Sequence, residues 1–170
     1  MEIDQVEGKE VVRVTKDLKV QAVDEPTFAK LIGSDFKNGI IEVTVLSKLL
    51  ENAPDFARGF IGVAFRIDEN NSKFEGIYIR PTNGRADDQL RRNRSTQYFS
   101  YPDFKFDRLR NESAGKYESY ADMGLNEWIK LKIEVRGESE TLLEWQQSAC
   151  VGGERSQTWR GWFRWNRLVG

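Results

Sequence analysis

The sequence predicts an all-β protein made of two packed antiparallel sheets, and three observations lead to this prediction. Apolar and polar residues alternate in several short stretches, which is the pattern of half-buried strands. Turn-forming residues, as in the stretch DENNS, separate these stretches. The stretches that favour a helix are few and short. Repeated short strands with turns between them are typical of a β sandwich.

Five stretches carry the alternation, and the predicted strands lie at 39–46, 59–67, 73–81, 97–101 and 127–137. Pro81 ends the third strand, because proline cannot donate a hydrogen bond to a sheet. The aliphatic faces of these strands predict a single core between the sheets, formed by Ile41, Val43, Ile61, Val63, Phe65, Ile77, Ile79, Leu131, Ile133 and Val135. A short helix is expected at 47–57 or at 27–32.

Composition limits the classes of function. The formal net charge is −1, so the chain has no bulk attraction for nucleic acid or for an anionic membrane, and neither is expected as a partner. The sequence contains no histidine, which removes the usual general base and the usual metal ligand. The single cysteine, Cys150, cannot form an internal disulfide. The oligomeric state stays open.

The sequence also gives an expectation for location. No apolar run approaches the length of a membrane span. The N-terminal stretch MEIDQVEGKEVVRV lacks the basic start and the apolar segment of a secretion signal. The chain as written is therefore expected to be cytoplasmic, and a secreted or periplasmic location stays open if the N-terminus has been trimmed.

Two connections, at 80–98 and 100–126, are longer than a hairpin needs, and they are rich in arginine and in aromatic residues respectively. Their aromatic content argues against disorder. Flat rings for stacking beside forked guanidinium donors suit a polar, ring-shaped ligand, which points to a carbohydrate. In the alternative interpretation, the loop arginines only form surface ion pairs with Asp87 and Asp88.

The alternation also predicts where a ligand binds. Arg66, Tyr78 and Arg80 fall opposite the aliphatic positions of their strands and are expected to share the sheet face away from the core. Polar side chains of the long loop are expected to fold over that face, because buried guanidinium groups need partners. The predicted ligand-binding residues are Arg66, Tyr78, Arg80, Asn83, Arg91, Arg92, Asn93, Gln97, Tyr98 and Tyr101.

Several stretches resemble a known family. ARGFIGVAFRI at 57–67, the segment from FEGIYIRPTNGR to FKFDRLR at 74–110, and GKYESYADMGLNEWIKLKIEV at 115–135 are similar to the concanavalin A-like lectin/glucanase superfamily. Within it they resemble laminin-G-like jelly-roll proteins related to the 3-keto-disaccharide and glycoside hydrolase domain. The resemblance covers 11–135 and implies a two-sheet jelly roll whose concave face holds a sugar. Relatives commonly carry a histidine where this chain has Arg94, so any chemistry of that histidine is lost here.

The end of the chain departs from that resemblance. It holds four of the five tryptophans: Trp145, Trp159, Trp162 and Trp165. Tryptophan has the single codon TGG, so the loss of one upstream base turns each of these codons into GGN, glycine, where the family pattern has glycine. We therefore predict a single-base slip near 137–141. It would leave a jelly-roll domain at 1–138 without its last native strands, followed by an out-of-frame tail at 139–170.

The alternative is a genuine tryptophan-rich ending that docks as an aromatic strand. Independent sequencing reads of the gene decide between the two, because one uninterrupted frame in every read rules out the slip. If the slip is real, the missing strands expose apolar surface and an unpaired strand edge. The protein is then expected to be only marginally stable.

A glycoside hydrolase activity and a calcium site stay open beside carbohydrate binding. A glycoside hydrolase needs two facing carboxyl groups. Glu42 and Glu75 are the best candidates, although the alternation places Glu75 on the core side. No cofactor is expected, with calcium as the one possible exception. Asp68, Asn70 and Asn71 in the stretch DENNS offer oxygen ligands for calcium, and the alternative is that this stretch is an ordinary turn.

Overall fold

The computed structural model describes residues 1–16, 19–20, 22, 24–137, 140–147 and 161–166. The chain forms two compact units, Met1–Asp35 and Phe36–Gly170. Among the described residues, no helix is both long enough and apolar enough to cross a membrane.

The first unit contains a β hairpin formed by β1 (Glu2–Val6) and β2 (Lys9–Arg13). Its turn consists of Glu7 and Gly8, which both have positive φ angles, at 52° and 76°. Positive φ at both turn residues is the geometry whose twist matches the twist of the flanking strands. The sequence analysis did not predict these two strands.

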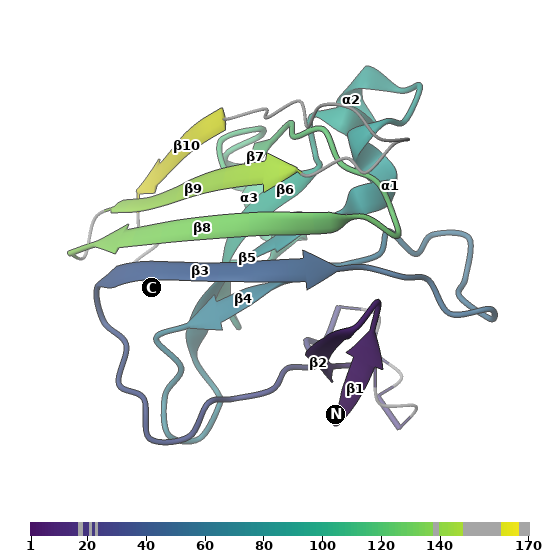
Figure 1. The fold of residues 1–170 in the computed structure, drawn as a ribbon. Coiled ribbons are helices and arrows are strands. Elements are labelled where there is room, and N and C mark those ends of the chain that lie inside the picture. Colours follow the sequence, from purple (N-terminus) through teal and green to yellow (C-terminus); the bar gives the residue numbers. More distant parts are fainter. Residues whose placement is uncertain (17–18, 21, 23, 138–139, 148–160, 167–170) are drawn as a thin grey trace. The chain divides into compact units, whose positions relative to one another are not determined.

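The second unit consists of two antiparallel sheets, drawn one in front of the other in Figure 1. Sheet I is formed, in order, by β10 (Gly161–Asn166), β9 (Glu140–Gln147), β8 (Trp128–Arg136) and β3 (Gly39–Leu46). Sheet II is formed, in order, by β4 (Ile61–Phe65), β5 (Phe74–Ile79), β6 (Thr96–Tyr101) and β7 (Glu118–Ser119). The predicted all-β sandwich of two antiparallel sheets is confirmed.

The core lies between the two sheets, and it has the predicted register. Six of the predicted core residues are buried: Phe65, Ile77, Ile79, Leu131, Ile133 and Val135. The other four are partly buried and pack against them: Ile41, Val43, Ile61 and Val63. A shift of one residue along a strand would have turned every one of these side chains outward. Each large aliphatic side chain that is fully buried contributes about 1.5–3 kcal/mol to stability.

Three short helices lie in the two long connections. α1 (Pro81–Gly84) and α2 (Gln89–Arg92) lie between β5 and β6, and α3 (Phe106–Glu112) follows β6. Pro81 is the first residue of α1, a position where proline loses no hydrogen bond. Arg80 is therefore the single residue between the end of β5 and the start of α1.

The predicted helix at 47–57 or 27–32 is wrong. In the first stretch, Ala53 and Ala57 each donate their N–H to the carbonyl three residues back, so the backbone forms separate turns that do not propagate. The second stretch is not helical either. A helix of this length has little stability unless packing supports it. Leu31, its one leucine, is 78% exposed.

The tryptophan-rich tail supplies β9 and β10. β9 pairs with β8 along its whole length, so the edge of β8 is covered, in contrast to the unpaired edge expected after a frame slip. Leu143 of β9 is fully buried in the core. This pairing agrees with the alternative of a tail that docks as a strand, and the frame slip itself stays a prediction. Cys150 and Trp159 lie outside the described residues.

Candidate functional site

The face of sheet II that points away from the core carries a row of polar side chains. Tyr78 of β5 lies opposite Gln97 of β6, and Gln97 lies opposite Glu118 of β7. Their neighbours in the strands, Ile77 and Tyr98, point into the core and are fully buried. Strand alternation therefore brings a phenol, an amide and a carboxylate together on the other face.

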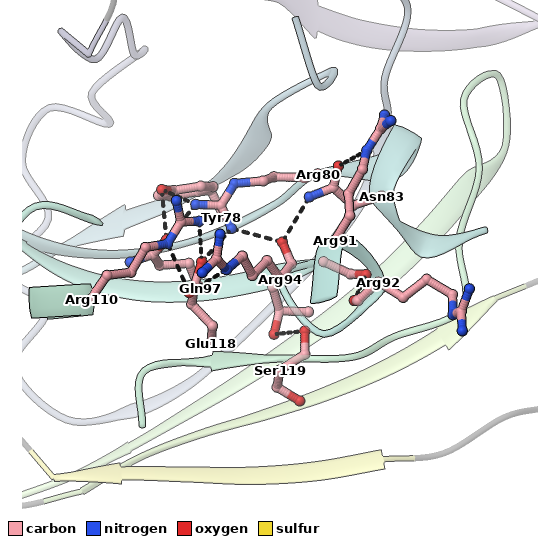
Figure 2. Close-up of polar contacts among 12 residues, drawn as sticks. Tyr78, Arg80, Asn83, Arg91, Arg92, Arg94, Gln97, Arg110, Glu118 and Ser119 are labelled. Carbon is pink, nitrogen blue, oxygen red and sulfur yellow. Dashed lines mark hydrogen bonds and ion pairs between the residues drawn. The ribbon is translucent and has the colours of Figure 1, made fainter. Parts of the chain in front are cut away.

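Three arginines surround the Glu118 carboxylate, as Figure 2 shows. Arg110 of α3 makes a two-pronged contact, with Nε 3.0 Å from Oε2 and Nη2 2.5 Å from Oε1. Arg80 Nη1 donates to Oε1 at 3.1 Å, and Arg94 Nε lies 3.5 Å from Oε2. We call these four residues the Glu118 cluster. Three positive charges and one negative charge give the cluster a net charge of +2.

The Glu118 cluster has a buried part and an accessible part. The side chains of Arg80 and Glu118 are each 5% exposed, whereas those of Arg110 and Arg94 are 26% and 34% exposed. Burial lowers the pKa of Arg80, and the like charge of Arg110 lowers it further, while Tyr78 and Glu118 oppose this change. The hydrogen bonds to Glu118 raise the pKa of Arg110. Arginine keeps its proton in proteins, so the net positive charge persists.

Tyr78 and Gln97 hold the second amino group of Arg80. Arg80 Nη2 donates to Tyr78 Oη at 2.8 Å and also to Gln97 Oε1. Gln97 Oε1 accepts a further hydrogen bond from the Tyr78 hydroxyl at 3.0 Å. The Gln97 side chain is fully buried, and its Nε2 has no acceptor among the described residues. A buried donor without an acceptor costs about 1–3 kcal/mol.

A line of aromatic rings extends along the same face. The rings of Phe60 and Phe99 meet the Tyr78 ring edge-on, with centroids 5.7 and 5.4 Å away. Phe99 also meets Phe74 at 5.9 Å, and Phe74 stacks on Tyr101 at 4.8 Å. We call these five residues the aromatic row. Phe60 is 58% exposed, so the row reaches solvent at this end.

One glycine and one cation–π contact help to position the aromatic row beside the Glu118 cluster. A Cβ atom at Gly76 would lie 2.5 Å from the Phe99 ring, so glycine allows Phe99 to lie across β5. The guanidinium carbon of Arg80 lies 4.8 Å from the centroid of the Tyr78 ring. This contact joins the aromatic row to the Glu118 cluster, and such contacts contribute about 0.5–2 kcal/mol.

The long loop positions two of the cluster arginines through its backbone. The Arg80 N–H donates to Ser95 O at 2.7 Å, directly after β5 and directly before β6. Arg80 Nη1 donates to Arg94 O at 2.7 Å. The loop therefore closes on itself where it leaves the sheet, and Arg80 and Arg94 are brought to the same end of the row of polar side chains.

Asn83, Arg91 and Arg92 brace this loop and do not cover the sheet face. Asn83 Nδ2 donates to Arg94 O at 3.1 Å, and its Oδ1 accepts from Arg91 Nε at 2.9 Å. Arg92 donates to two backbone carbonyls of the same loop at 2.6 and 2.8 Å. Figure 2 shows Arg91 and Arg92 directed away from Glu118. The acceptors in these contacts are amide and carbonyl oxygens. The contacts therefore also differ from the ion pairs with loop carboxylates that the alternative interpretation predicts.

Two of the predicted ligand-binding residues lie elsewhere. Arg66 follows β4 with a φ angle of 53°, which breaks the strand alternation, and its Nη1 donates to Glu75 at 2.9 Å. Tyr98 is fully buried in the core, and its hydroxyl donates to Glu75 at 2.6 Å. The predictions that Arg66 shares a face with Arg80 and that Tyr98 stacks on a ligand are therefore wrong. Tyr98 directly follows Gln97 in the strand and has to point the opposite way.

The structure brings together only part of the predicted set. Tyr78, Arg80 and Gln97 meet at Glu118, Tyr101 lies at the far end of the aromatic row, and Asn93 is exposed at the end of α2. Six residues of the site were not predicted from the sequence: Phe60, Phe74, Phe99, Arg94, Arg110 and Glu118. The alternation of QYFSY could have identified Phe99. Nothing in the sequence indicated Glu118, because its position depends on the pairing of the two-residue strand β7.

The two candidate catalytic carboxyl groups lie on different sheets. Glu42 of β3 is about half exposed and pairs with Lys130 at 3.0 Å. Glu75 of β5 is 4% exposed and points into the core, as its alternation predicted. The two carboxylates therefore do not form the facing pair that a glycoside hydrolase needs.

The DENNS stretch is a turn. Both carboxylate oxygens of Asp68 accept hydrogen bonds from Ser72, one from its N–H at 2.7 Å and one from its hydroxyl at 2.6 Å. Asn71 has a φ angle of 58°, which asparagine tolerates in turns, and Asn70 is exposed. The part of the chain that the structure describes holds no group of three or more acidic residues, histidines or cysteines arranged to bind a metal.

Comparison with known proteins does not identify the chain. No protein-family model, no curated protein and no solved structure matches it. The resemblance to concanavalin A-like proteins therefore stays an expectation.

Proposed function

We propose that this chain is a carbohydrate-binding domain with the jelly-roll topology of concanavalin A-like proteins, and that its ligand lies on the outer face of sheet II. The observation that supports this most is the position of the aromatic row directly beside the Glu118 cluster. Sugar rings have apolar faces that stack on aromatic side chains, and hydroxyl groups that need hydrogen-bond partners. A sheet face that offers both within one surface suits such a ligand.

The two ends of the aromatic row have different roles in this proposal. Phe60 is 58% exposed and touches Tyr78, so these two rings form the platform for the sugar. Phe74 is 3% exposed and supports Phe99 from the side. The polar contacts come from Arg94 and Arg110, because these guanidinium groups remain partly accessible.

The hydrolase alternative is weaker on the same face. Hydrolysis of a glycosidic bond requires two carboxyl groups with separate roles as acid and as nucleophile or base. Among the described residues, the carboxylate that faces the aromatic row is Glu118, and three arginines already hold it. We therefore propose binding without hydrolysis.

Replacement of Phe60 by Ala tests the platform. We expect Phe60→Ala to weaken binding about tenfold, since loss of a stacking ring costs roughly 1–1.5 kcal/mol. A glycan array of neutral and acidic oligosaccharides identifies a bound sugar, and isothermal titration calorimetry measures its affinity. Phe56→Ala is the matched control, because Phe56 is 56% exposed, is a close neighbour in the sequence and is no part of the aromatic row.

Two results would contradict the proposal. One is the absence of binding to any sugar on the array by the folded protein. The other is an equal loss of affinity in Phe56→Ala and Phe60→Ala. Release of reducing ends from a bound oligosaccharide would instead favour the hydrolase.

A further inference from the structure

We propose that the bound sugar is acidic, and that Arg94 and Arg110 bind its carboxylate. This inference rests on the carbohydrate-binding function proposed above and adds the chemical class of the ligand. Uronic acids combine a stacking ring face with a carboxylate, so an oligosaccharide that contains uronate is the expected ligand.

The Glu118 cluster carries an excess of positive charge. One carboxylate is surrounded by three guanidinium groups, which gives a net charge of +2 on one sheet face. The whole chain, in contrast, has a formal net charge of −1. The cluster is therefore positively charged, although the chain as a whole is slightly negative. One added carboxylate reduces the net charge of the cluster to +1 and gives the accessible arginines a partner.

Arg94 makes only a loose contact with Glu118. Its Nε lies 3.5 Å from Glu118, whereas the contacts of Arg80 and Arg110 with the same carboxylate are 3.1 Å or shorter. A guanidinium group has five N–H donors. Within the described part of the chain, the contact with Glu118 is the single polar contact of the Arg94 side chain. Arg94 is thus the cluster arginine with most donors to offer, and it is the most exposed of the three.

Within the part of the chain that the structure describes, a neutral donor beside the cluster lacks an acceptor. The Gln97 amide lies in contact with Arg80 and Tyr78, and its Nε2 has no acceptor among the described residues. A hydrogen-bond donor in this position lacks an oxygen partner at the same place where positive charge is in excess. The unpaired amide calls for an oxygen acceptor, and the excess of positive charge calls for that oxygen to carry negative charge.

The donors left in the cluster suit a carboxylate. Arg110 already binds the Glu118 carboxylate through Nε and Nη2, which leaves its Nη1 for a ligand. Arg94 contacts Glu118 through Nε at 3.5 Å, and arginine recognises carboxylates most specifically through two parallel donors. The rings of Phe60 and Tyr78 lie next to Arg80, so a sugar ring on this platform would carry its carboxylate toward the cluster.

Matched saccharides separate the charge of the ligand from its shape. The probes are oligogalacturonate, the same oligogalacturonate with its carboxyls methyl-esterified, and a sulfated neutral oligosaccharide of equal length. We expect the full chain to bind the acid at least about tenfold more tightly than its methyl ester at low salt. We also expect the preference to shrink as salt is added, because exposed charges are screened.

Variants assign the effect to Arg94. Arg94→Gln is expected to reduce the affinity for oligogalacturonate about tenfold and to leave the affinity for the methyl ester within about twofold. Arg108→Gln is the control, because it removes the same charge from α3 while its ion pair with Glu112 lies outside the cluster. It is expected to leave both affinities within about twofold.

Each outcome supports or overturns the inference. Equal binding of the acid and the methyl ester overturns it and leaves carbohydrate binding intact. Preference for the sulfated probe overturns the carboxylate assignment. Equal effects of Arg94→Gln and Arg108→Gln overturn the role of Arg94. If no saccharide binds, both the inference and the proposed function fail.

Discussion

Sheet II buries one glutamate on each of its faces, and the two differ in their partners. Glu75 points into the core, where it accepts from Arg66 at 2.9 Å and from the Tyr98 hydroxyl at 2.6 Å. Glu118 lies on the outer face, within 3.5 Å of three arginines. Both carboxylate side chains are 5% exposed. Burial alone therefore does not distinguish a structural carboxylate from one in a candidate binding site.

The difference lies in charge balance and in what the arginines connect. Arg66 and Glu75 carry equal and opposite charges, and Arg66 also donates to Asn38 beside β3 and to the Gly137 carbonyl beside β8. That pair ties sheet II to both neighbouring strands of sheet I. Around Glu118 the arginines outnumber the carboxylate, and two of them face solvent. A balanced pair holds a fold together, whereas an unbalanced cluster can still receive a ligand.

The largest expected effect is on the Glu75 side. Glu75→Ala leaves the Arg66 charge and the Tyr98 hydroxyl without their carboxylate, and we expect a loss of about 3 kcal/mol in the free energy of unfolding. This expected loss lies at the lower end of the range for breaking a buried ion pair, because the Arg66 side chain is 14% exposed and keeps other hydrogen-bond acceptors. Urea denaturation measures it. Glu42→Gln removes an exposed carboxylate and should change stability by less than about 0.5 kcal/mol. A similar loss in both variants would contradict a structural role specific to Glu75.

Glu118→Gln is expected to separate stability from binding. The substitution keeps the shape of the side chain but removes the negative charge that compensates Arg80, so we expect a loss of about 2 kcal/mol. It also raises the net charge of the cluster by one, and binding of an acidic oligosaccharide should become tighter. Thermal unfolding and calorimetric titration on the same samples measure the two effects. Weaker binding together with lower stability would show that Glu118 positions the arginines more than it opposes the ligand.

The same substitution at two tyrosines gives the smallest effects and compares the two faces most directly. Tyr98→Phe removes the hydroxyl that donates to buried Glu75, and we expect it to cost about 1–2 kcal/mol of stability with no change in binding. Tyr78→Phe removes a half-buried hydroxyl between Arg80 and Gln97, and we expect it to cost about 0.5–1 kcal/mol while binding weakens. Chemical denaturation and calorimetry check both. A reversed order of the two stability losses would contradict the assignment of Tyr98 to the structural side.

The sandwich and its core could be predicted because they depend on local alternation. Ile77, Ile79, Leu131 and Ile133 are buried as the period of a strand requires. The error at Arg66 has a local cause as well, because a positive φ angle directly after β4 ends the alternation that the prediction extended. The helices were misplaced, because short helical turns in loops depend on tertiary contacts more than on propensity.

The candidate site could be predicted only in part, because it is assembled from distant segments. Tyr78 and Gln97 belong to neighbouring strands, Arg80 directly follows the first of them, and their shared face follows from parity. Arg110 and Glu118 come from a helix and from a very short strand, and no pattern in the sequence pairs them. The prediction that the loop arginines cover the sheet face is wrong for a related reason. Arg91, Arg92 and the backbone oxygens that they contact all belong to one irregular loop, whose internal contacts follow no sequence pattern.

Gln97 has a consequence for any attempt to engineer this protein for heat resistance. An apolar residue of similar volume at this position would remove a buried donor that lacks an acceptor, but it is expected to lower the stability, because two other donors would lose their acceptor. The same change would delete the amide oxygen that aligns the Tyr78 hydroxyl and the Arg80 guanidinium. Stability and recognition thus both depend on this amide oxygen, and a substitution chosen only to remove the unpaired donor would weaken both.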